Sequence, residues 1–291
     1  MAEEIRVLIG QYQEGKITRR EFILKAVAFT GSLAASYALI DFLVDFRIYA
    51  GEVDPNDPAL LCHDVEYSGR ATPVFGYLAR PAALGKFPAI VVIHANQGLN
   101  EYTQDVARRL AKQGYVSLAV DCLSRHGGTK KVNPKGEALG NIRDLAPWYG
   151  VAEDVDSGFI FLRTFPDVRA DRIGLIGFCW GGEMTFSSAT QIRGLKAAVV
   201  FYGRSPEPLD LVKNIQAPVL AHYGERDPTV NQGITSTEEA MKKYNKSYTY
   251  KIYPGAQHGF HTGNNLERYH PDAAKEAWAM TLDFFRKQLQ A

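Results

Sequence analysis

Cys179 is the centre of a Gly-x-Cys-x-Gly motif whose residue types suit a nucleophilic thiol. A β-type apolar run, residues 172–178, ends in this motif, and a helix-like segment, residues 182–191, follows it. Such a strand–turn–helix connection is a nucleophile elbow, in which a sharp turn holds the nucleophile in a strained backbone conformation. Side chains at Gly177 or Gly181 would collide with the neighbouring strand and helix. The motif therefore predicts nucleophilic catalysis by the thiol of Cys179.

Two further loops offer the partners that a thiol nucleophile needs. Asp227 follows the apolar run 218–223, and His258 follows the run 248–253. We expect both runs to be strands of a parallel sheet, which gathers its active-site residues at the carboxyl ends of its strands. A histidine can take the thiol proton, and a carboxylate can fix the tautomer of the histidine and stabilise the imidazolium. The chain order of nucleophile, acid and histidine is that of α/β-hydrolases, so a Cys-His-Asp triad is predicted.

Backbone N–H groups beside the thiol are expected to hold the oxyanion of a tetrahedral intermediate. Trp180 follows the nucleophile directly, and Asn96 lies in the loop after His94. The N–H groups of Trp180 and Asn96 are the predicted oxyanion hole. The N-terminus of the helix that follows Cys179 would also favour the thiolate. We interpret His94, which ends a strand, as a structural histidine rather than a catalytic base.

The elements needed to position these residues alternate between strand and helix along the chain. Such alternation predicts an α/β-hydrolase fold for residues 51–291, with a mostly parallel central sheet and helices on both faces. A hairpin of residues 65–67 and 74–79 is expected to precede it. Residues 124–148 are rich in Gly, Pro and charge, and are interpreted as a substrate rim or lid. The expected later strands are 89–94, 115–120, 172–178, 197–202, 219–223 and 248–253, and the expected helices are 105–113, 154–165, 182–191, 235–244 and 271–289.

The first fifty residues permit two hypotheses. Residues 18–23, Thr-Arg-Arg-Glu-Phe-Ile, look like a twin-arginine export signal, with the uncharged run 26–40 after them and a small-x-small site at 36–38. The same residues also fit a packed helix, because Thr18 and Glu21 form a capping box and apolar residues follow at helical spacing.

These two hypotheses place the protein differently. A signal or anchor would make it exported, periplasmic or membrane-associated, with membrane contact through residues 18–45. A structural helical extension of residues 1–50 would leave it cytoplasmic. The sequence leaves both open, as it leaves the oligomeric state open.

Composition excludes some classes of partner. Lys plus Arg number 33 and Asp plus Glu number 32, so no basic field is present to attract nucleic acid. Cys62, Cys122 and Cys179 form no metal-type cluster and no disulfide framework, and we interpret them as free thiols. A bridge between Cys62 and Cys122 remains an alternative if the protein is exported.

At these motifs the sequence resembles the dienelactone hydrolase family, also called carboxymethylenebutenolidases, from about Val65 to Leu289. The resemblance implies a cysteine hydrolase that opens lactones or other carboxylic esters through a thioester, with no metal or organic cofactor and with a small-molecule ester or lactone as its partner. It rests on five stretches, namely residues 177–182 (Gly-Phe-Cys-Trp-Gly-Gly), 258–260 (His-Gly-Phe), 224–227 (Gly-Glu-Arg-Asp), 105–111 and 123–125.

The chain departs from the family pattern in the loop after the first central strand. Ala95 stands where many relatives carry a glutamate that interacts with the thiol and couples its activation to substrate binding. Either the pair of Cys179 and His258 is preformed here, or activity is low, or the substitution was engineered.

A second departure concerns the two arginines that hold the substrate carboxylate in the dienelactone-specific members. Arg125 matches the first, but Thr262 stands at the second position, four residues after His258. Loss of a bidentate carboxylate partner argues against dienelactone itself as the preferred substrate. The aromatic residues expected to line an apolar ester pocket instead are Tyr102, Trp148, Tyr202 and Phe260.

Other functions fit the same scaffold. The alanine at position 95 would suit a non-catalytic binding or thiol-sensing protein, since a fold does not fix a function. A cysteine-dependent acyl transferase or peptidase is a further alternative. The complete triad favours ester hydrolysis over both.

Overall fold

The computed structural model describes residues 7, 8, 11, 17, 19–32, 52–262 and 267–290. The chain divides into two units, residues 1–50 and residues 51–291. In the first unit, helix α2 (Arg19–Thr30) buries Phe22 and Ala26. Most of the predicted uncharged run of the signal, including its small-x-small site, lies outside the described residues.

The two hypotheses for the first fifty residues differ in whether this segment contacts a membrane. No helix among the described residues is both long enough and apolar enough to cross a bilayer. Export, anchoring and a packed extension therefore all stay predictions, and so does the location of the protein.

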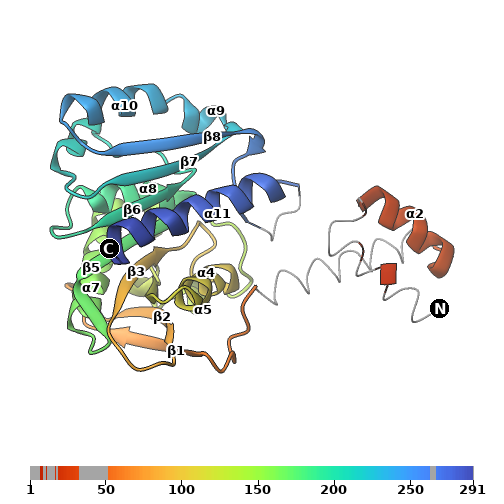
Figure 1. Cartoon of the computed structure of the whole chain (residues 1–291), viewed down its shortest axis with the longest axis horizontal. Helices are drawn as coiled ribbons and strands as arrows, with labels where there is room; N and C mark the ends of the chain where they lie inside the picture. The colour runs from red at the N-terminus through yellow and green to blue at the C-terminus, as the bar shows by residue number, and fades with distance from the viewer. Residues whose placement is uncertain are drawn as a thin grey trace. The chain divides into compact units, whose positions relative to one another are not determined.

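The second unit is built on an eight-stranded sheet with the order β1-β2-β4-β3-β5-β6-β7-β8 (Figure 1). Strands β3 to β8 run parallel to one another, whereas β2 pairs antiparallel with both β1 and β4. The strands are β1 (Leu60–Tyr67), β2 (Val74–Pro81), β3 (Phe87–Ile93), β4 (Val116–Val120), β5 (Val168–Phe178), β6 (Ala197–Phe201), β7 (Val219–Arg226) and β8 (Tyr248–Gln257).

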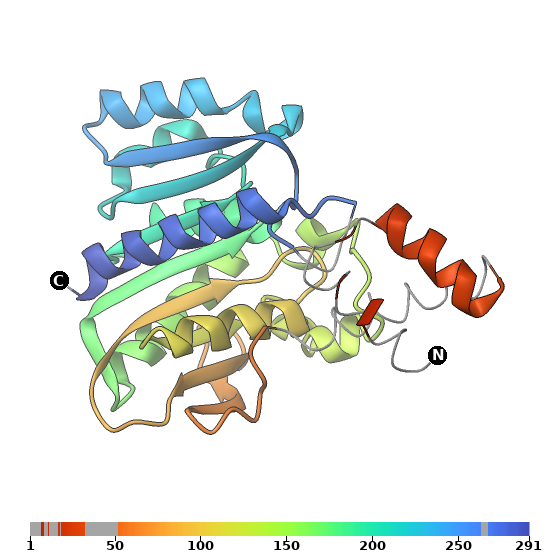
Figure 2. The ribbon, with the colours of Figure 1, turned by 45° about the vertical axis from the view of Figure 1, so that its right-hand side comes forward.

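Helices cover both faces of this sheet, as the alternating pattern predicted (Figures 1 and 2). Helices α7, α8 and α10 pack on one face, and α4 and α11 pack on the other. The helices are α4 (Glu101–Lys112), α5 (Thr129–Val132), α6 (Ile142–Leu145), α7 (Trp148–Thr164), α8 (Trp180–Ala189), α9 (Pro228–Asn231), α10 (Ile234–Lys243) and α11 (Pro271–Phe285), with short 3-10 turns η1 (Ser124–His126) and η2 (Leu209–Asn214) and a final π-helical turn η3 (Arg286–Gln290).

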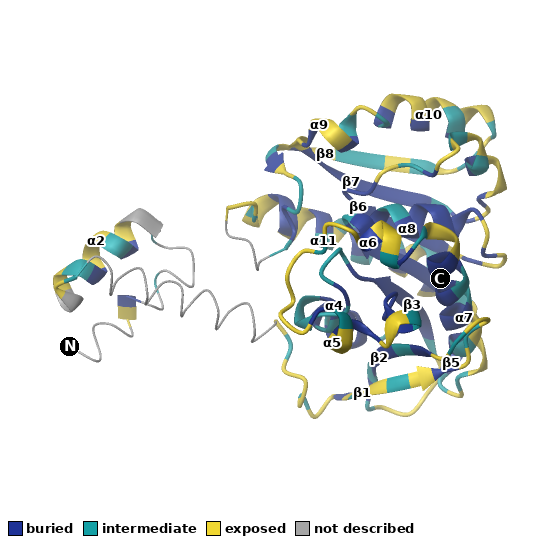
Figure 3. Cartoon of the chain, turned by 180° about the vertical axis from the view of Figure 1, so that it is seen from behind, coloured by how far each residue is buried: buried dark blue, intermediate teal, exposed yellow. Residues whose placement is uncertain are grey.

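Strand β3 shows why the sheet is buried on both sides. Val91 and Ile93 belong to the core under α7 and α8, whereas Ile90 and Val92 belong to the core under α4 and α11. Successive side chains of a strand point to opposite faces, so a continuous apolar run is needed where both faces are covered. The buried central strands in Figure 3 follow from this pattern.

Residues 124–148 are more regular than the sequence suggested. They contain η1, α5 and α6, and the carboxylate of Asp121 fixes the start of α5. The N–H of Thr129 donates to Asp121 Oδ2 at 2.7 Å, and its hydroxyl donates to Oδ1 at 2.8 Å. The segment is therefore tied to the end of β4 rather than free to swing as a loop.

Candidate active site

The elbow at Cys179 joins β5 to α8 with a strained backbone. Cys179 has φ of 57° and ψ of −119°, and its N–H donates to the carbonyl of Phe201 at 3.0 Å. A positive φ is uncommon for a residue with a side chain and marks a candidate functional position. A Cβ at Gly177 would lie 2.2 Å from the carbonyl oxygen of Gly181, and one at Gly181 would lie 2.3 Å from that of His94. The predicted collisions are thus present.

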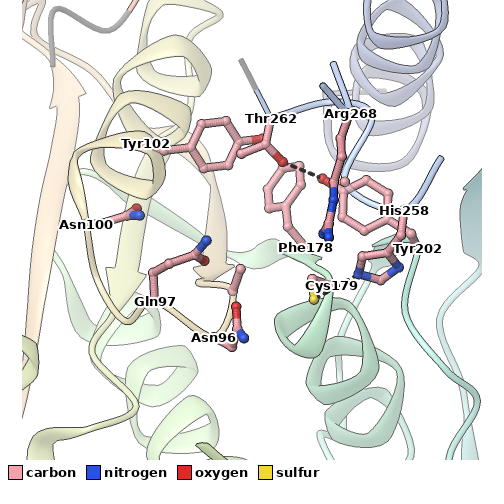
Figure 4. A pocket seen from close by; sticks show the side chains of 12 residues that line it. Asn96, Gln97, Asn100, Tyr102, Phe178, Cys179, Tyr202, His258, Thr262 and Arg268 are labelled. Atoms are coloured by element: carbon pink, nitrogen blue, oxygen red, sulfur yellow. Dashed lines mark hydrogen bonds between the residues drawn. The ribbon is translucent and has the colours of Figure 1, made fainter. Parts of the chain in front are cut away.

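The three predicted catalytic side chains meet at the carboxyl edge of the sheet, after β5, β7 and β8. His258 Nε2 lies 3.0 Å from Cys179 Sγ, and His258 Nδ1 lies 2.5 Å from Asp227 Oδ2 (Figure 4). An ionised carboxylate only accepts hydrogen bonds, so Nδ1 donates to Asp227 and Nε2 faces the thiol. Asp227 is itself 5% exposed and caps α9 by accepting from the N–H of Val230.

The charge state of His258 depends on these two partners. Burial alone lowers the pKa of His258, but its hydrogen bonds to Asp227 and Cys179 outweigh burial and raise that pKa to about 9. The proton-bearing imidazolium is therefore the favoured form at neutral pH. A cation at this position stabilises a thiolate beside it.

The two backbone N–H groups predicted to form the oxyanion hole belong to Trp180 and Asn96. Trp180 is the first residue of α8, and Asn96 lines the same pocket as Cys179. Within residues 52–262 and 267–290, neither the N–H of Trp180 nor that of Asn96 donates a hydrogen bond. First-turn N–H groups of a helix lack intrahelical acceptors, which leaves that of Trp180 available to an anion.

The pocket in front of Cys179 combines amide, aromatic and hydroxyl groups (Figure 4). The Tyr102 hydroxyl lies 2.6 Å from His261 Nδ1, and the Tyr202 hydroxyl lies 3.2 Å from the Thr262 hydroxyl. Burial raises the pKa of both tyrosines, so their hydroxyls stay protonated and neutral. The described lining residues are Ala95, Asn96, Gln97, Asn100, Tyr102, Phe178, Cys179, Tyr202, His258, Gly259, Thr262 and Arg268.

Two predicted substrate-binding residues are placed elsewhere. The guanidinium of Arg125 pairs with Asp154 at 2.9 Å and with Glu153 at 2.8 Å, and these hydrogen bonds raise its pKa. Phe260 is fully buried in the core, with its ring 5.4 Å from that of Tyr202. Neither Arg125 nor Phe260 is among the described lining residues of this pocket, and substrate contact by either stays a prediction.

The segment predicted to form a rim or lid also contributes no described lining residue. Residues 124–148 pack against the end of β4, and Trp148 is 45% exposed beside Tyr149. The rim of the described pocket comes instead from the loops after β3 and β8.

Arg268 is a pocket residue that the sequence did not single out. It is exposed, lies ten residues after His258 along the chain, and is the one arginine or lysine among the described lining residues. No aspartate or glutamate is in that lining. Gln97 and Asn100 were missed as well, although both belong to the loop that carries Asn96. No group of three or more metal-ligating side chains occurs in the described part of the chain.

The same fold occurs among known proteins. The sequence model of the dienelactone hydrolase family matches residues 74–289. The chain belongs to this family. A Bradyrhizobium sp. protein named as a candidate 2-oxo-3-(5-oxofuran-2-ylidene)propanoate lactonase is 35% identical over 229 residues, which cover 73% of this chain and 89% of the relative.

Two further members extend the similarity. A candidate carboxymethylenebutenolidase of Synechocystis is 31% identical over 230 residues, covering 75% of this chain and 93% of the relative. The crystal structure of a candidate dienelactone hydrolase from Klebsiella pneumoniae aligns with a TM-score of 0.72 at 26% identity, over 79% of this chain and 99% of that one. As a family member, the protein is a hydrolase of carboxylic ester or lactone bonds.

Proposed function

We propose that this hydrolase works by covalent catalysis, with Cys179 as nucleophile, His258 as proton carrier and Asp227 as the group that orients His258. The observation that carries the proposal is the unbroken hydrogen-bonded chain from Sγ through the imidazole to the carboxylate. A nucleophile and a base within hydrogen-bond reach, with the base oriented by a third group, form the general arrangement for this chemistry.

In the first half of the reaction, the Cys179 thiolate attacks the carbonyl carbon and forms a C–S bond. The carbonyl oxygen becomes an oxyanion, which the N–H groups of Trp180 and Asn96 stabilise. Collapse of this intermediate breaks the C–O bond, and His258 Nε2–H gives its proton to the departing alkoxide. The products of this half are an alcohol, or the tethered hydroxyl of an opened lactone, and a thioester on Cys179.

In the second half, water releases the acyl group. The now neutral His258 takes a proton from water, and the hydroxide adds to the thioester carbonyl at the same oxyanion hole. Breaking the C–S bond returns the thiolate, and His258 again carries the proton. The net reaction consumes one ester bond and one water and forms one acid and one alcohol.

Ala95 bears on how the thiol is kept ready. Its methyl side chain lies in the pocket wall and offers no polar atom to the sulfur. Among the described residues, the hydrogen-bond partner of Sγ is His258. Of the explanations open for Ala95, a preformed pair of Cys179 and His258 is the one that this geometry favours, because the pair needs no glutamate to release it.

Arg268 suggests a substrate class. Arg268 is the one arginine or lysine among the described lining residues, which include no aspartate or glutamate, and this favours a substrate that carries a negative charge away from the scissile bond. The name of the Bradyrhizobium relative is that of a carboxylate-bearing lactone, which agrees with this preference. We therefore propose an ester or lactone with a carboxylate group, held by Arg268 instead of by Arg125.

The test is turnover of a panel of aryl esters and lactones, with and without a carboxylate, by the full chain and by Cys179→Ala. We expect the variant to lose activity by a factor of about 10⁴ or more, because a triad acts as a unit. Cys122→Ala is the matched control and should keep activity, since Cys122 is buried and outside the described pocket lining. Unchanged hydrolysis by Cys179→Ala would refute the mechanism, and transfer to added alcohol or amine acceptors would favour an acyl transferase.

A further inference from the structure

His94 is a buried histidine at the end of β3, and its two ring nitrogens have opposite roles. Nδ1 lies 2.6 Å from the carbonyl oxygen of Ala95, and Nε2 lies 3.1 Å from the backbone nitrogen of Cys122. A carbonyl only accepts and a backbone N–H only donates, so Nδ1 carries the proton and Nε2 carries the lone pair. Burial lowers the pKa of His94, which keeps this neutral tautomer in place.

The hydrogen bond from Nδ1 fixes the peptide that offers the oxyanion donor. The carbonyl of Ala95 and the N–H of Asn96 belong to one planar trans peptide, so they point in opposite directions. Holding the carbonyl against the His94 ring therefore aims the N–H of Asn96 away from that ring. Asn96 lines the pocket together with Cys179 (Figure 4). The N–H of Gly98 also donates to the Ala95 carbonyl, at 3.2 Å.

The same ring adjoins the other predicted donor. His94 stacks on the indole of Trp180 with centroids 5.5 Å apart and an interplanar angle of 26°. The elbow also packs closely here, because a Cβ at Gly181 would lie 2.3 Å from the His94 carbonyl oxygen. One side chain thus contacts both segments that supply the oxyanion hole, the loop after β3 and the start of α8.

We propose that His94 is a positioning residue for the oxyanion hole, acting through its Nδ1–H bond to Ala95. This inference rests on the proposed function, because it gives His94 a task in the same reaction. His94 does not touch the reacting atoms and exchanges no proton with substrate. Its task is to aim the N–H of Asn96 at the position that the tetrahedral oxyanion will occupy, since donors must be aimed before charge develops.

Two substitutions at one position separate this role from a merely structural one. In His94→Asn the side-chain amide can occupy the place of Nδ1 and donate to Ala95, but nothing replaces Nε2. In His94→Gln the longer side chain can place an oxygen near Nε2 to accept from Cys122, but the bond to Ala95 is lost. Both variants remove the same ring from the same buried site, so each serves as the control for the other.

We expect His94→Asn to keep kcat within about threefold of its parent, and His94→Gln to lose about 10- to 100-fold in kcat with little change in KM. His94→Gln should also bind an aldehyde inhibitor, which forms a tetrahedral adduct, more weakly by a similar factor. Alkylation of Cys179 by iodoacetamide should be unchanged in both, because His258 and Asp227 keep their contacts. Three results would overturn the proposal. One is a kcat that is retained in His94→Gln and lost in His94→Asn, the second is an equal loss of kcat in both variants, and the third is slower alkylation of Cys179 in either variant.

Failure of this inference can be told apart from failure of the mechanism by including Cys179→Ala in the same assays. If Cys179→Ala is inactive while His94→Gln retains kcat, only the role of His94 is refuted. If Cys179→Ala retains turnover, the covalent mechanism is refuted, and the oxyanion hole assigned here has no reaction to serve.

Discussion

Cys122 and Cys179 follow strands β4 and β5 of the same sheet, and each has a histidine close by. The two thiols differ in their burial and in their contact with that histidine. Cys122 follows β4, is buried, and contacts the Nε2 of His94 through its backbone N–H rather than its thiol. Cys179 follows β5, is partly exposed to the pocket, and directs its sulfur at His258. Burial raises the pKa of the Cys122 thiol, which therefore stays protonated.

The two histidines differ in the same way. Burial lowers the pKa of His94, whereas the carboxylate of Asp227 helps to raise the pKa of His258 to about 9. His94 is thereby kept neutral, and His258 is kept charged at neutral pH. A carboxylate behind the imidazole and access to the pocket, rather than adjacency of Cys and His, separate a reactive pair from a structural one.

The largest expected effect comes from removing the carboxylate behind His258, so that the pair of Cys179 and His258 resembles the pair of Cys122 and His94, which among the described residues has no such carboxylate bonded to its imidazole. Asp227→Asn removes the negative charge behind His258 and allows the wrong tautomer, so kcat should fall by about 10³- to 10⁴-fold. Steady-state kinetics on a carboxylate-bearing aryl ester would measure this, with circular dichroism to verify folding. The matched control is Glu225→Gln, because Glu225 is exposed and lies in the same loop as Asp227. Asp121→Asn is unsuitable as a control, because the carboxylate of Asp121 holds the start of α5. If kcat falls by less than tenfold in Asp227→Asn, Asp227 does not orient His258.

Reactivity toward iodoacetamide compares the two thiols directly. We expect Cys179 to be alkylated at least about 100-fold faster than Cys122, because the latter is buried and protonated at neutral pH. Peptide mapping by mass spectrometry after short exposures gives both rates from one sample. The selectivity should shrink in His258→Ala. Similar rates for the two cysteines in the native protein would remove the distinction drawn between the two pairs.

The pH dependence of activity tests the charge on His258. Its pKa is raised in the folded protein, so the imidazolium form is present below pH 9 and is lost as the pH rises through about 9. Because the departing alkoxide needs that proton, kcat/KM should fall about tenfold per pH unit above this point. Asp227→Asn should move the fall to lower pH. A profile that is flat to pH 10, or the same in both proteins, would contradict the assignment.

The smallest effect is expected at the pocket mouth. Arg268→Gln should raise KM for a carboxylate-bearing ester by about tenfold and leave KM for its neutral analogue unchanged, since an exposed charge pair contributes modestly. Arg125→Gln is the informative control, because it tests the position that the family pattern suggested. If Arg125→Gln raises KM for the carboxylate-bearing ester alone and Arg268→Gln leaves both KM values unchanged, the substrate carboxylate is held by Arg125 and not by Arg268.

Local motifs made the fold predictable, and with it the meeting of Cys179, His258 and Asp227. The glycines around Cys179, the strand-like run before each catalytic residue, and the order of the three residues are all visible in the sequence. The hairpin of β1 and β2 was also expected, although β1 begins at Leu60 and not at residue 65. These features depend on nearby residues or on chain order, which a single sequence displays.

What the sequence could not display are contacts between distant residues. The partner of Arg125 is Asp154, 29 residues away on α7, and no local pattern links them. Phe260 directly follows the catalytic loop but points into the core, where its ring packs near Phe201. Arg268 reaches the pocket from ten residues beyond His258 without any motif around it. The arrangement of Cys179, His258 and Asp227 was therefore easier to predict than the set of side chains that line the pocket.

The central claim is that Cys179 carries the acyl group during turnover. Acid quench of the full chain during hydrolysis of an aryl ester, followed by intact-mass and peptide analysis, tests it most directly. The account predicts a mass increase equal to the acyl group on the Cys179 peptide, reversed by hydroxylamine and retained in Cys122→Ala. An acyl group on any other residue, or full turnover by Cys179→Ala without a label at position 179, would contradict it.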